Sequence, residues 1–404
     1  MRQHGALQRL AALVADVAAA PGGAAAATKQ LHLLLLVLEN ATFTCPDNGN
    51  ALAELQLTSK GGVSRPASRQ GRPPQQQQGQ AGASQDAEGQ QGQTFPAVLV
   101  CVGQQLLQDI GQEQSHAALH ALLSVLMNLI HDNKQGGALL CTSGGMDVAA
   151  DVYSRLLQPS AGSQESLCAA VLQHLELVSV ALGVLMNLVS NEPQHSRRLA
   201  AAGSQDAAAA AAGGLSGSAL GGDNGSSTEV SSFVRLLCTV MTALGQLLQH
   251  HNESEEAALA PPQAAATDSA AAAAGGSRGE ALPAGAKVVT TPSAAADALG
   301  SNSVSEASIV ETYSGILLGF LVRDGGAGLA ASVAALLPGG SLDPLLSATG
   351  RCLDFYVRTG AITDHTRSTL EQLLRQLKEL QQPQQQGAGQ QQGGSQEHEP
   401  MLVE

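Results

Sequence analysis

The sequence lacks tryptophan and has only three Tyr and five Phe in 404 residues. Aromatic side chains supply much of the buried area of an ordinary core, so a folded core here needs many small and aliphatic side chains instead. Basic residues are also few, with 20 Lys and Arg against 34 Asp and Glu and a net charge of −14. A chain this acidic, without a Lys/Arg cluster, repels phosphate backbones, so we expect no direct binding to nucleic acid.

The six cysteines include no Cys-x-x-Cys pair, which argues against the common zinc-ligand spacing and against a disulfide framework. The apolar run "LHLLLLVL" at 31–38 is too short to cross a bilayer. We therefore expect an intracellular, soluble protein with no metal, no cofactor and no membrane contact. The Arg- and Ala-rich start "MRQHGALQRLAALVADVAAA" also fits an organelle transit peptide, but we interpret it as a first helix that ends at Pro21.

Four stretches rich in Ala, Gln, Gly, Ser and Pro cannot bury enough apolar surface to offset the entropy of the chain. We predict disorder for 58–95, 201–228, 252–307 and 381–404. The remaining segments are predicted to fold as helical repeats at 1–57 and 96–200, a single helix at 229–251 and C-terminal helical repeats at 308–380.

The pentapeptide "VLMNL" occurs twice, with its Asn at Asn128 and at Asn187, and the near-copy "LLLVLENATFT" places Asn40 in the same position. Apolar residues before each Asn recur with the period of an amphipathic helix. A polar turn follows each Asn. Pro46 and Pro193 each lie six residues after their Asn, and a Pro at such a position is typical of the first turn of a helix. Each unit is therefore predicted to be a long helix, a short turn and a second helix.

A fourth, weaker copy, "TYSGILLGFLVRDGG", has Gly319 in place of the Asn. The four positions are 88, 59 and 132 residues apart, and without the predicted insertions the first and last spacings shorten to about 50 and about 48. Those values lie near the length of HEAT and armadillo units, and no segment alternates as a strand does. The sequence predicts an all-α fold, a HEAT/armadillo-like α-solenoid interrupted by disordered low-complexity insertions.

An Asn within an apolar helix must find hydrogen-bond partners or destabilise the fold. Two interpretations of Asn40, Asn128 and Asn187 remain open. They can brace neighbouring helices from within, as a ladder of stacked side chains, or they can line a groove and bind the backbone of a partner peptide.

Two patterns resemble a cofactor site or a metal site without making one. Gly326-x-Gly328-x-x-Ala331 matches a dinucleotide fingerprint, but the preceding apolar run repeats the helical units and no second strand follows. His116 and His120 have the spacing of a helical metal pair, but no third ligand lies nearby in sequence, so we interpret them as a solvated face. With no recognisable nucleophile and base motif, we expect no catalytic residues and no enzymatic activity.

The repeat segments and the C-terminal stretch together resemble a known family. "LLLLVLENATFTCPDNGNALAEL", "VALGVLMNLVSNEPQHSRRL" and the stretch from "VETYSGILLGFLVRDGG" to "TRSTLEQLLRQLKEL" are similar, in order, to the C-terminal domain of the Wings apart-like (Wapl) cohesin-release proteins. The last stretch is the most specific. It combines a Tyr-x-x-x-Leu-Leu-Gly-x-Leu helix, a Leu-Pro-x-Gly turn at Leu337, Pro338 and Gly340, and a closing amphipathic helix.

The resemblance implies a helical module without catalysis that binds cohesin subunits and a cohesin-associated HEAT-repeat protein. It would promote cohesin release and sister-chromatid resolution, and would act in the nucleus. The chain departs from the family in having no Phe-Gly-Phe docking motif and no recognisable counterpart of the first helices of the module.

We expect the partner to contact the Leu-Pro-x-Gly turn and the exposed side of the next helix. The residues concerned are Pro338, Gly340, Asp343, Arg351 and Asp354. The alternative function is a generic armadillo/HEAT adaptor that binds an extended peptide along Asn40, Asn128 and Asn187.

Overall fold

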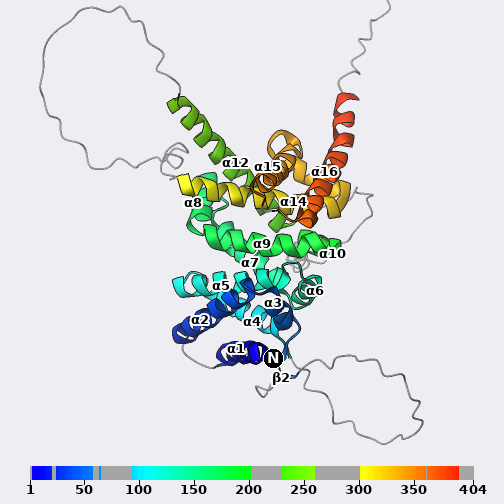
Figure 1. Cartoon of the computed structure of the whole chain (residues 1–404). Coiled ribbons are helices and arrows are strands. Elements are labelled where there is room, and N and C mark those ends of the chain that lie inside the picture. Colours follow the sequence, from blue (N-terminus) through cyan, green and yellow to red (C-terminus); the bar gives the residue numbers. More distant parts are fainter. Residues whose placement is uncertain are drawn as a thin grey trace, which may run out of the picture.

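The computed structural model describes residues 2–20, 24–57, 63–64, 93–201, 230–259, 301–360 and 362–390. The described part is almost entirely helical, which confirms the predicted all-α class. The helices follow one another from the N-terminal end of the molecule to the C-terminal end (Figure 1).

Four long central helices pack in succession, α2 on α5, α5 on α9 and α9 on α14. They span Ala24–Phe43 (α2), Glu113–Ile130 (α5), Leu175–Asn191 (α9) and Ser301–Leu336 (α14). These are the helices that carry Asn40, Asn128, Asn187 and Gly319. Residues of similar sequence therefore occupy corresponding places in the fold.

An outer helix precedes each central helix and packs against it. The outer helices are Arg2–Ala19 (α1), Phe95–Gln108 (α4), Gly145–Leu157 (α7) and Ser232–Leu259 (α12). A short 3₁₀ turn, Gln158–Ser160 (η1), and helix α8, Gln164–Gln173, lie between α7 and α9.

A short helix follows each of the first three central helices and packs against both that helix and the next central helix. These short helices are Pro46–Ala53 (α3), Lys134–Thr142 (α6) and Pro193–Ala201 (α10). Each begins six residues after its Asn, as the sequence predicts. In the fourth unit the corresponding place is a break inside α14, where Gly326 has φ of 74°.

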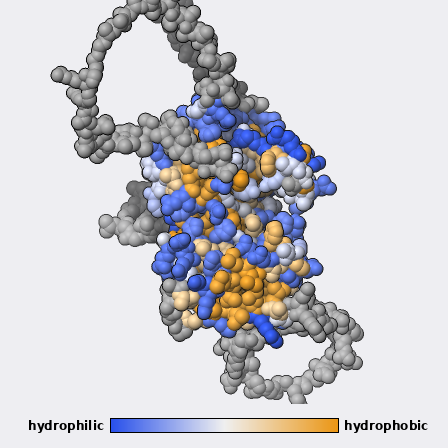
Figure 2. All heavy atoms as spheres, turned by 60° about the vertical axis from the view of Figure 1, so that its left-hand side comes forward, coloured by the Kyte–Doolittle hydropathy of each residue, from blue (hydrophilic) through white to orange (hydrophobic). Residues whose placement is uncertain are grey.

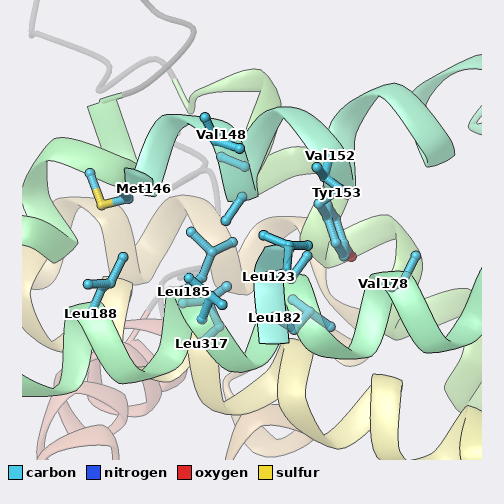
Figure 3. Close-up of a cluster of buried hydrophobic side chains, with 14 of the residues drawn as sticks. Leu123, Met146, Val148, Val152, Tyr153, Val178, Leu182, Leu185, Leu188 and Leu317 are labelled. Atoms are coloured by element: carbon cyan, nitrogen blue, oxygen red, sulfur yellow. The ribbon is translucent and has the colours of Figure 1, made fainter. Parts of the chain in front are cut away.

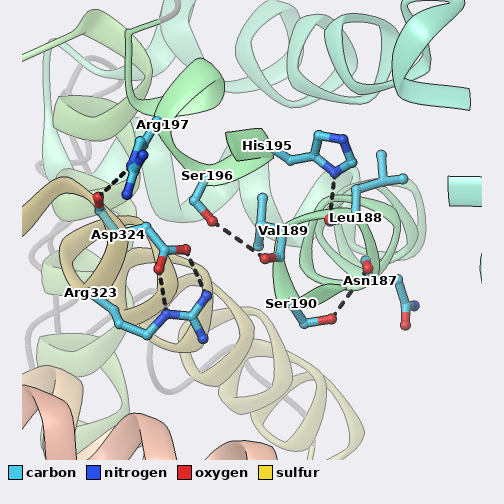
Figure 4. Close-up of polar contacts among 9 residues, drawn as sticks. All are labelled: Asn187, Leu188, Val189, Ser190, His195, Ser196, Arg197, Arg323 and Asp324. Carbon is cyan, nitrogen blue, oxygen red and sulfur yellow. Dashed lines mark hydrogen bonds and ion pairs between the residues drawn. The ribbon is translucent and has the colours of Figure 1, made fainter. Parts of the chain in front are cut away.

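The start of each short helix is fixed by local chemistry. Pro46 and Pro193 occupy the first position of α3 and α10, where a missing N–H costs nothing. Asn133 caps α6 by accepting a hydrogen bond from the Gly136 N–H at 2.8 Å. In α10, His195 Nδ1 lies 3.0 Å from the Leu188 carbonyl, and Ser196 Oγ donates to the Val189 carbonyl at 3.4 Å, which ties the short helix back to α9 (Figure 4).

Helix α10 also forms a polar contact with the next central helix, α14. Arg197 Nε donates to the carbonyl of Asp324 at 3.1 Å, close to the break in α14 (Figure 4). Asp324 itself is paired with Arg323 at 2.6 Å, and both side chains are largely buried. These contacts join one unit to the next through polar groups at the edge of the core.

The core runs unbroken through the stack and is made almost wholly of aliphatic side chains. Leu123 of α5, Leu182 of α9 and Leu317 of α14 are each 0% exposed and belong to one cluster (Figure 3). Tyr153 of α7 is the largest fully buried side chain, and its ring lies edge-on to Phe233 of α12. Leu52, Leu140 and Leu199, each twelve residues after its Asn, are 1% exposed and close the core from the short helices.

The C-terminal end consists of a 3₁₀ turn, Pro338–Gly340 (η2), and helices Asp343–Thr359 (α15) and Asp364–Gln390 (α16). Both helices pack against α14 and against each other. Gly360, with φ of 66°, ends α15 in the left-handed conformation that a side chain would strain.

Several predicted boundaries differ from the structure. The single helix predicted at 229–251 extends to Leu259, α14 begins at Ser301, and α16 continues to Gln390. The rest of the stretches predicted to be disordered at 201–228, 252–307 and 381–404 lies outside the described residues, apart from Ala201 at the end of α10. Of the stretch predicted at 58–95, 58–62 and 65–92 also lie outside them, whereas Phe95 begins α4.

A small antiparallel sheet, which the sequence did not predict, lies at both ends of the 58–95 stretch. It has order β2-β1-β3 and comprises Gln56–Leu57 (β1), Val63–Ser64 (β2) and Gln93–Thr94 (β3). Strands of two residues are too short to show alternation, so no strand pattern could be recognised in the sequence.

Candidate protein-interaction surface

The Leu-Pro-x-Gly turn projects from the C-terminal end of the fold. Leu337 and Leu342, on either side of it, are 4% and 0% exposed, whereas Pro338 and Gly340 are exposed. Gly339 and Gly340 have φ of 76° and 65°, which favours glycine at both positions. The two buried leucines therefore anchor a turn whose tip is presented to solvent.

The polar residues expected on α15 share one face of the helix. Asp343, Arg351 and Asp354 are all exposed, and their spacing of eight and three residues places them within one stripe. Ser347 and Arg358 belong to the same stripe by spacing. The expected contact residues are thus brought together on a single surface, with acidic and basic groups mixed along it.

Asp343 links α15 to α16 at the start of this stripe. Gln381 Nε2 of α16 donates to Asp343 Oδ1 at 2.8 Å, and Ser341 Oγ donates to Asp343 Oδ2 at 2.8 Å. These two hydrogen bonds, that of Gln381 first, lower the pKa of Asp343 below its usual value. The carboxylate is therefore a fixed negative charge that also holds the two helices in register.

Arg351 is engaged within the fold. Its Nη2 donates to Glu311 of α14, at 2.7 Å to Oε1 and 2.5 Å to Oε2, and its Nη1 donates to Ser347 at 2.7 Å. The Glu311 side chain is only 8% exposed, whereas the Arg351 side chain is 51% exposed. A buried carboxylate requires a paired cation, so the first role of Arg351 is to hold α15 on α14.

Asp354 adjoins an apolar part of the surface that the sequence reasoning missed. Phe355 and Val357 are 55% and 44% exposed, although both are large apolar side chains. The Phe355 ring lies edge-on to Tyr356, whose hydroxyl is 3.2 Å from that of Tyr313 on α14. An exposed aromatic beside charged groups is typical of a protein-binding surface.

The helical pattern indicates the exposure of Val357 but not that of Phe355. The buried side chains of α15, Leu345, Ala348, Thr349 and Cys352, recur at helical spacing. Val357 falls outside that buried stripe, whereas Phe355 lies three residues after Cys352 and continues it, so the pattern alone predicts a buried Phe355.

The three repeat asparagines differ in what they bind. Asn128 Nδ2 donates to the Glu39 carbonyl at 3.3 Å and to Thr42 Oγ1 at 3.1 Å, which joins α5 to α2. Asn40 and Asn187 instead donate to carbonyls within their own helices, those of Leu36 at 2.8 Å and Gly183 at 3.0 Å. Only Asn128 is therefore a brace between helices, and the hydrogen bonds do not form a continuous ladder.

His116, expected together with His120 to lie on a solvated face, is instead half-buried beside another histidine. His116 Nε2 lies 3.2 Å from Nδ1 of His174, which stands at the junction between α8 and α9. Burial and then the neighbouring His174 lower the pKa of His116, and burial lowers the pKa of His174. No group of three or more potential metal ligands is found within the described part of the chain.

The apparent dinucleotide fingerprint is helical. Gly326, Gly328 and Ala331 lie within α14, at the break at Gly326 and just after it, and do not follow a strand. By length and composition alone, Ser232–Glu255 and Val304–Leu336 could each cross a membrane, and 56% of each apolar window is buried inside the fold.

No protein-family model matches the chain, and no curated protein matches it significantly.

Proposed function

We propose that the chain is a HEAT/armadillo-like α-solenoid that regulates the association of cohesin with chromatin, as the Wapl-like resemblance implies. In this proposal it acts in the nucleus by protein–protein contact and without catalysis. Its partners are cohesin subunits and a cohesin-associated HEAT-repeat protein. Promotion of cohesin release and of sister-chromatid resolution would follow from those contacts.

The solenoid part of the proposal is supported by the order of the helices. Outer, central and short helices recur in that order three times, and corresponding helices of successive units pack against each other. Units that cannot bury their apolar faces alone and stack to form one core are typical of such arrays.

One observation carries the binding part of the proposal. The stretch with the most specific resemblance includes α15, whose exposed surface places Asp354 and Arg358 beside the exposed Phe355. An aromatic anchor with a charged rim is what a protein partner would recognise. The net charge of −14 also suits a module that contacts proteins in preference to DNA.

The proposal is tested by affinity purification of tagged full-length chain from nuclear extract, followed by mass spectrometry. Cohesin core subunits should be recovered with the wild type and lost when Phe355→Ser and Asp354→Lys are combined. Both side chains are exposed, so the variant should keep its helical circular dichroism spectrum. His365→Gln, an exposed substitution on α16, is the matched control and should retain the subunits.

A second function is favoured by a separate observation. Asn40 is exposed and Asn128 and Asn187 are half-buried, at corresponding places on three stacked helices. Because the amide of Asn128 is already engaged by α2, Asn40 and Asn187 are the side chains that would hydrogen-bond the backbone of an extended peptide. If this second proposal holds, Asn187→Ala should abolish capture of a peptide partner without changing recovery of cohesin.

A further inference from the structure

An apolar strip lies uncovered on one flank of α2. Leu33 and Val37 are each 55% exposed, and Leu13 of the adjoining α1 is 49% exposed. Apolar side chains gather at the end of the molecule where α1 and α2 lie (Figure 2). Single exposed apolar residues are ordinary, but Leu33 and Val37 lie one turn apart on the same face of α2 and together form an uncovered apolar strip that needs an explanation.

The corresponding flank is covered in the next unit. Ala121 and Val125 of α5 occupy the places of Leu33 and Val37, and both are 0% exposed. In α9, Val184 occupies the same place as Val37 and is also 0% exposed. Each of these central helices packs against the central helix that precedes it, and α2 is the first of the series within the described residues.

Besides apolar packing, the contact between α5 and α2 includes hydrogen bonds from one side chain. Asn128 of α5 donates to the carbonyl of Glu39 and the hydroxyl of Thr42, both on α2. Asn40 occupies the place of Asn128 on α2, is exposed, and, within the described part of the chain, donates to the carbonyl of Leu36 in its own helix. The flank of α2 therefore presents both the apolar strip and the amide donor that α5 uses to bind a helix.

We propose that this outer flank of α2, formed by Leu33, Val37 and Asn40, binds an apolar helix of a partner protein. The bound helix lies on α2 as α2 lies on α5. It contributes an apolar face to Leu33 and Val37, and a backbone carbonyl or a Ser/Thr hydroxyl to Asn40. The interface continues the helix stacking that the rest of the chain already uses.

A partner helix fits better than a second copy of the same flank. In the α2–α5 contact the two helices use different flanks, one with Glu39 and Thr42 and the other with Asn128. A symmetric dimer would bring two identical flanks together, so Asn40 of neither copy would meet the flank with Glu39 and Thr42 that Asn128 meets. The site is also remote from α15, at the opposite end of the molecule, so its test is independent of cohesin binding (Figure 1).

The probe is a synthetic fluorescein-labelled peptide with the sequence of residues 24–44, because α2 is the helix that covers the equivalent flank of α5. Leu33→Gln and Val37→Gln in the peptide keep its own outer flank from associating. Binding to the full-length protein is followed by fluorescence anisotropy, and light scattering establishes the oligomeric state of the protein first.

We expect a monomeric protein and saturable binding that Val37→Glu in the protein weakens more than tenfold. Asn40→Ala should weaken binding about 3- to 10-fold, the equivalent of one hydrogen bond. Thr42→Ala in the peptide should weaken binding to the wild type but not to the Asn40→Ala protein. Phe355→Ser, at the other end of the molecule, is the matched control and should bind as the wild type does.

Two results would overturn the proposal. One is no saturable binding, or equal binding to the wild-type and Val37→Glu proteins, both shown by circular dichroism to be folded. The other is a wild-type dimer that Val37→Glu converts to a monomer, which would assign the flank to a second copy of the chain.

Discussion

Arg351 of α15 holds the nearly buried carboxylate of Glu311 on α14, 40 residues earlier in the chain. The pair fixes the helix that carries the proposed binding surface onto the central stack. Arg351, expected to be a contact residue, therefore acts first as a positioning residue for its neighbours on α15.

We predict that Arg351→Ala lowers the free energy of unfolding by about 2 kcal/mol, less than a fully buried pair because the Arg side chain is half exposed. Urea denaturation followed by circular dichroism measures the effect. Arg358→Ala, on the same exposed stripe, should change stability by less than about 0.5 kcal/mol. If Glu311 is the partner that matters, Glu311→Gln combined with Arg351→Ala should cost less than the two single changes together, and strict additivity would refute the pairing.

The contact between His116 and His174 predicts that the stability of the fold depends on pH. The pKa values of His116 and His174 are lowered from 6.5, so the unfolded chain binds protons more readily than the folded chain. The two neutral histidines therefore contribute to the free energy of unfolding above pH 6.5. This contribution is lost as the pH falls from 6.5 through the lower pKa values that the histidines have in the folded chain. His120 and Glu176 also face His116; His120 adds to the lowering, whereas Glu176 opposes it.

The measurement is urea denaturation at pH 7.5 and at pH 5. His174→Gln should reduce the loss of stability between the two pH values, and His365→Gln, at an exposed site on α16, should leave it unchanged. An identical loss in the wild type and in His174→Gln would show that the pair does not contribute.

Asn128 and Asn40 occupy matching places but should differ in their effect on stability. Asn128→Ala removes two hydrogen bonds between α5 and α2, so we expect a loss of about 1 kcal/mol. Asn40→Ala removes a bond within one exposed turn and should change stability by less than about 0.5 kcal/mol. Thermal unfolding of the two variants side by side decides the point, and equal losses would contradict the assignment.

Gly315 of α14 permits the close approach of α15. A Cβ at Gly315 would lie 2.7 Å from the Cβ of Ala348, so Gly315→Ala should destabilise the protein by about 1–3 kcal/mol. Gly350, on α15, has nothing within 4 Å of such an atom, and Gly350→Ala should instead stabilise the helix by about 0.5–1 kcal/mol. Opposite signs in denaturant unfolding are the expected result, and two losses of equal size would argue against this packing.

The sequence predicts the helical class and the order of helices well because both depend on local patterns. The apolar period before each Asn and the prolines six residues after Asn40 and Asn187 are local signals, and α3 and α10 begin at those prolines. Asn191 lies two residues before Pro193 and is of a residue type that often caps helices, but it is the last residue of α9 and donates to the Asn187 carbonyl. Cap positions shift by a residue or two because neighbouring turns compete for the same groups.

Contacts between distant residues could not be predicted in the same way. His174 lies 58 residues from His116, and Glu311 lies 40 residues from Arg351, so no local pattern pairs them. The sequence also treated the three repeat asparagines as equivalent, whereas the bonds each one makes depend on what packs beside it. Asn40 on the first central helix is exposed, and Asn128 has α2 to bind.

Direct binding between purified full-length protein and purified cohesin core complex tests the central claim most directly. Surface plasmon resonance of the wild type should give a saturable response, and the Phe355→Ser, Asp354→Lys variant should lose it while remaining folded. The Val37→Glu variant, altered at the other end of the molecule, should bind as the wild type does. No binding by a folded, monodisperse wild-type protein, or undiminished binding by the α15 variant, would contradict the account.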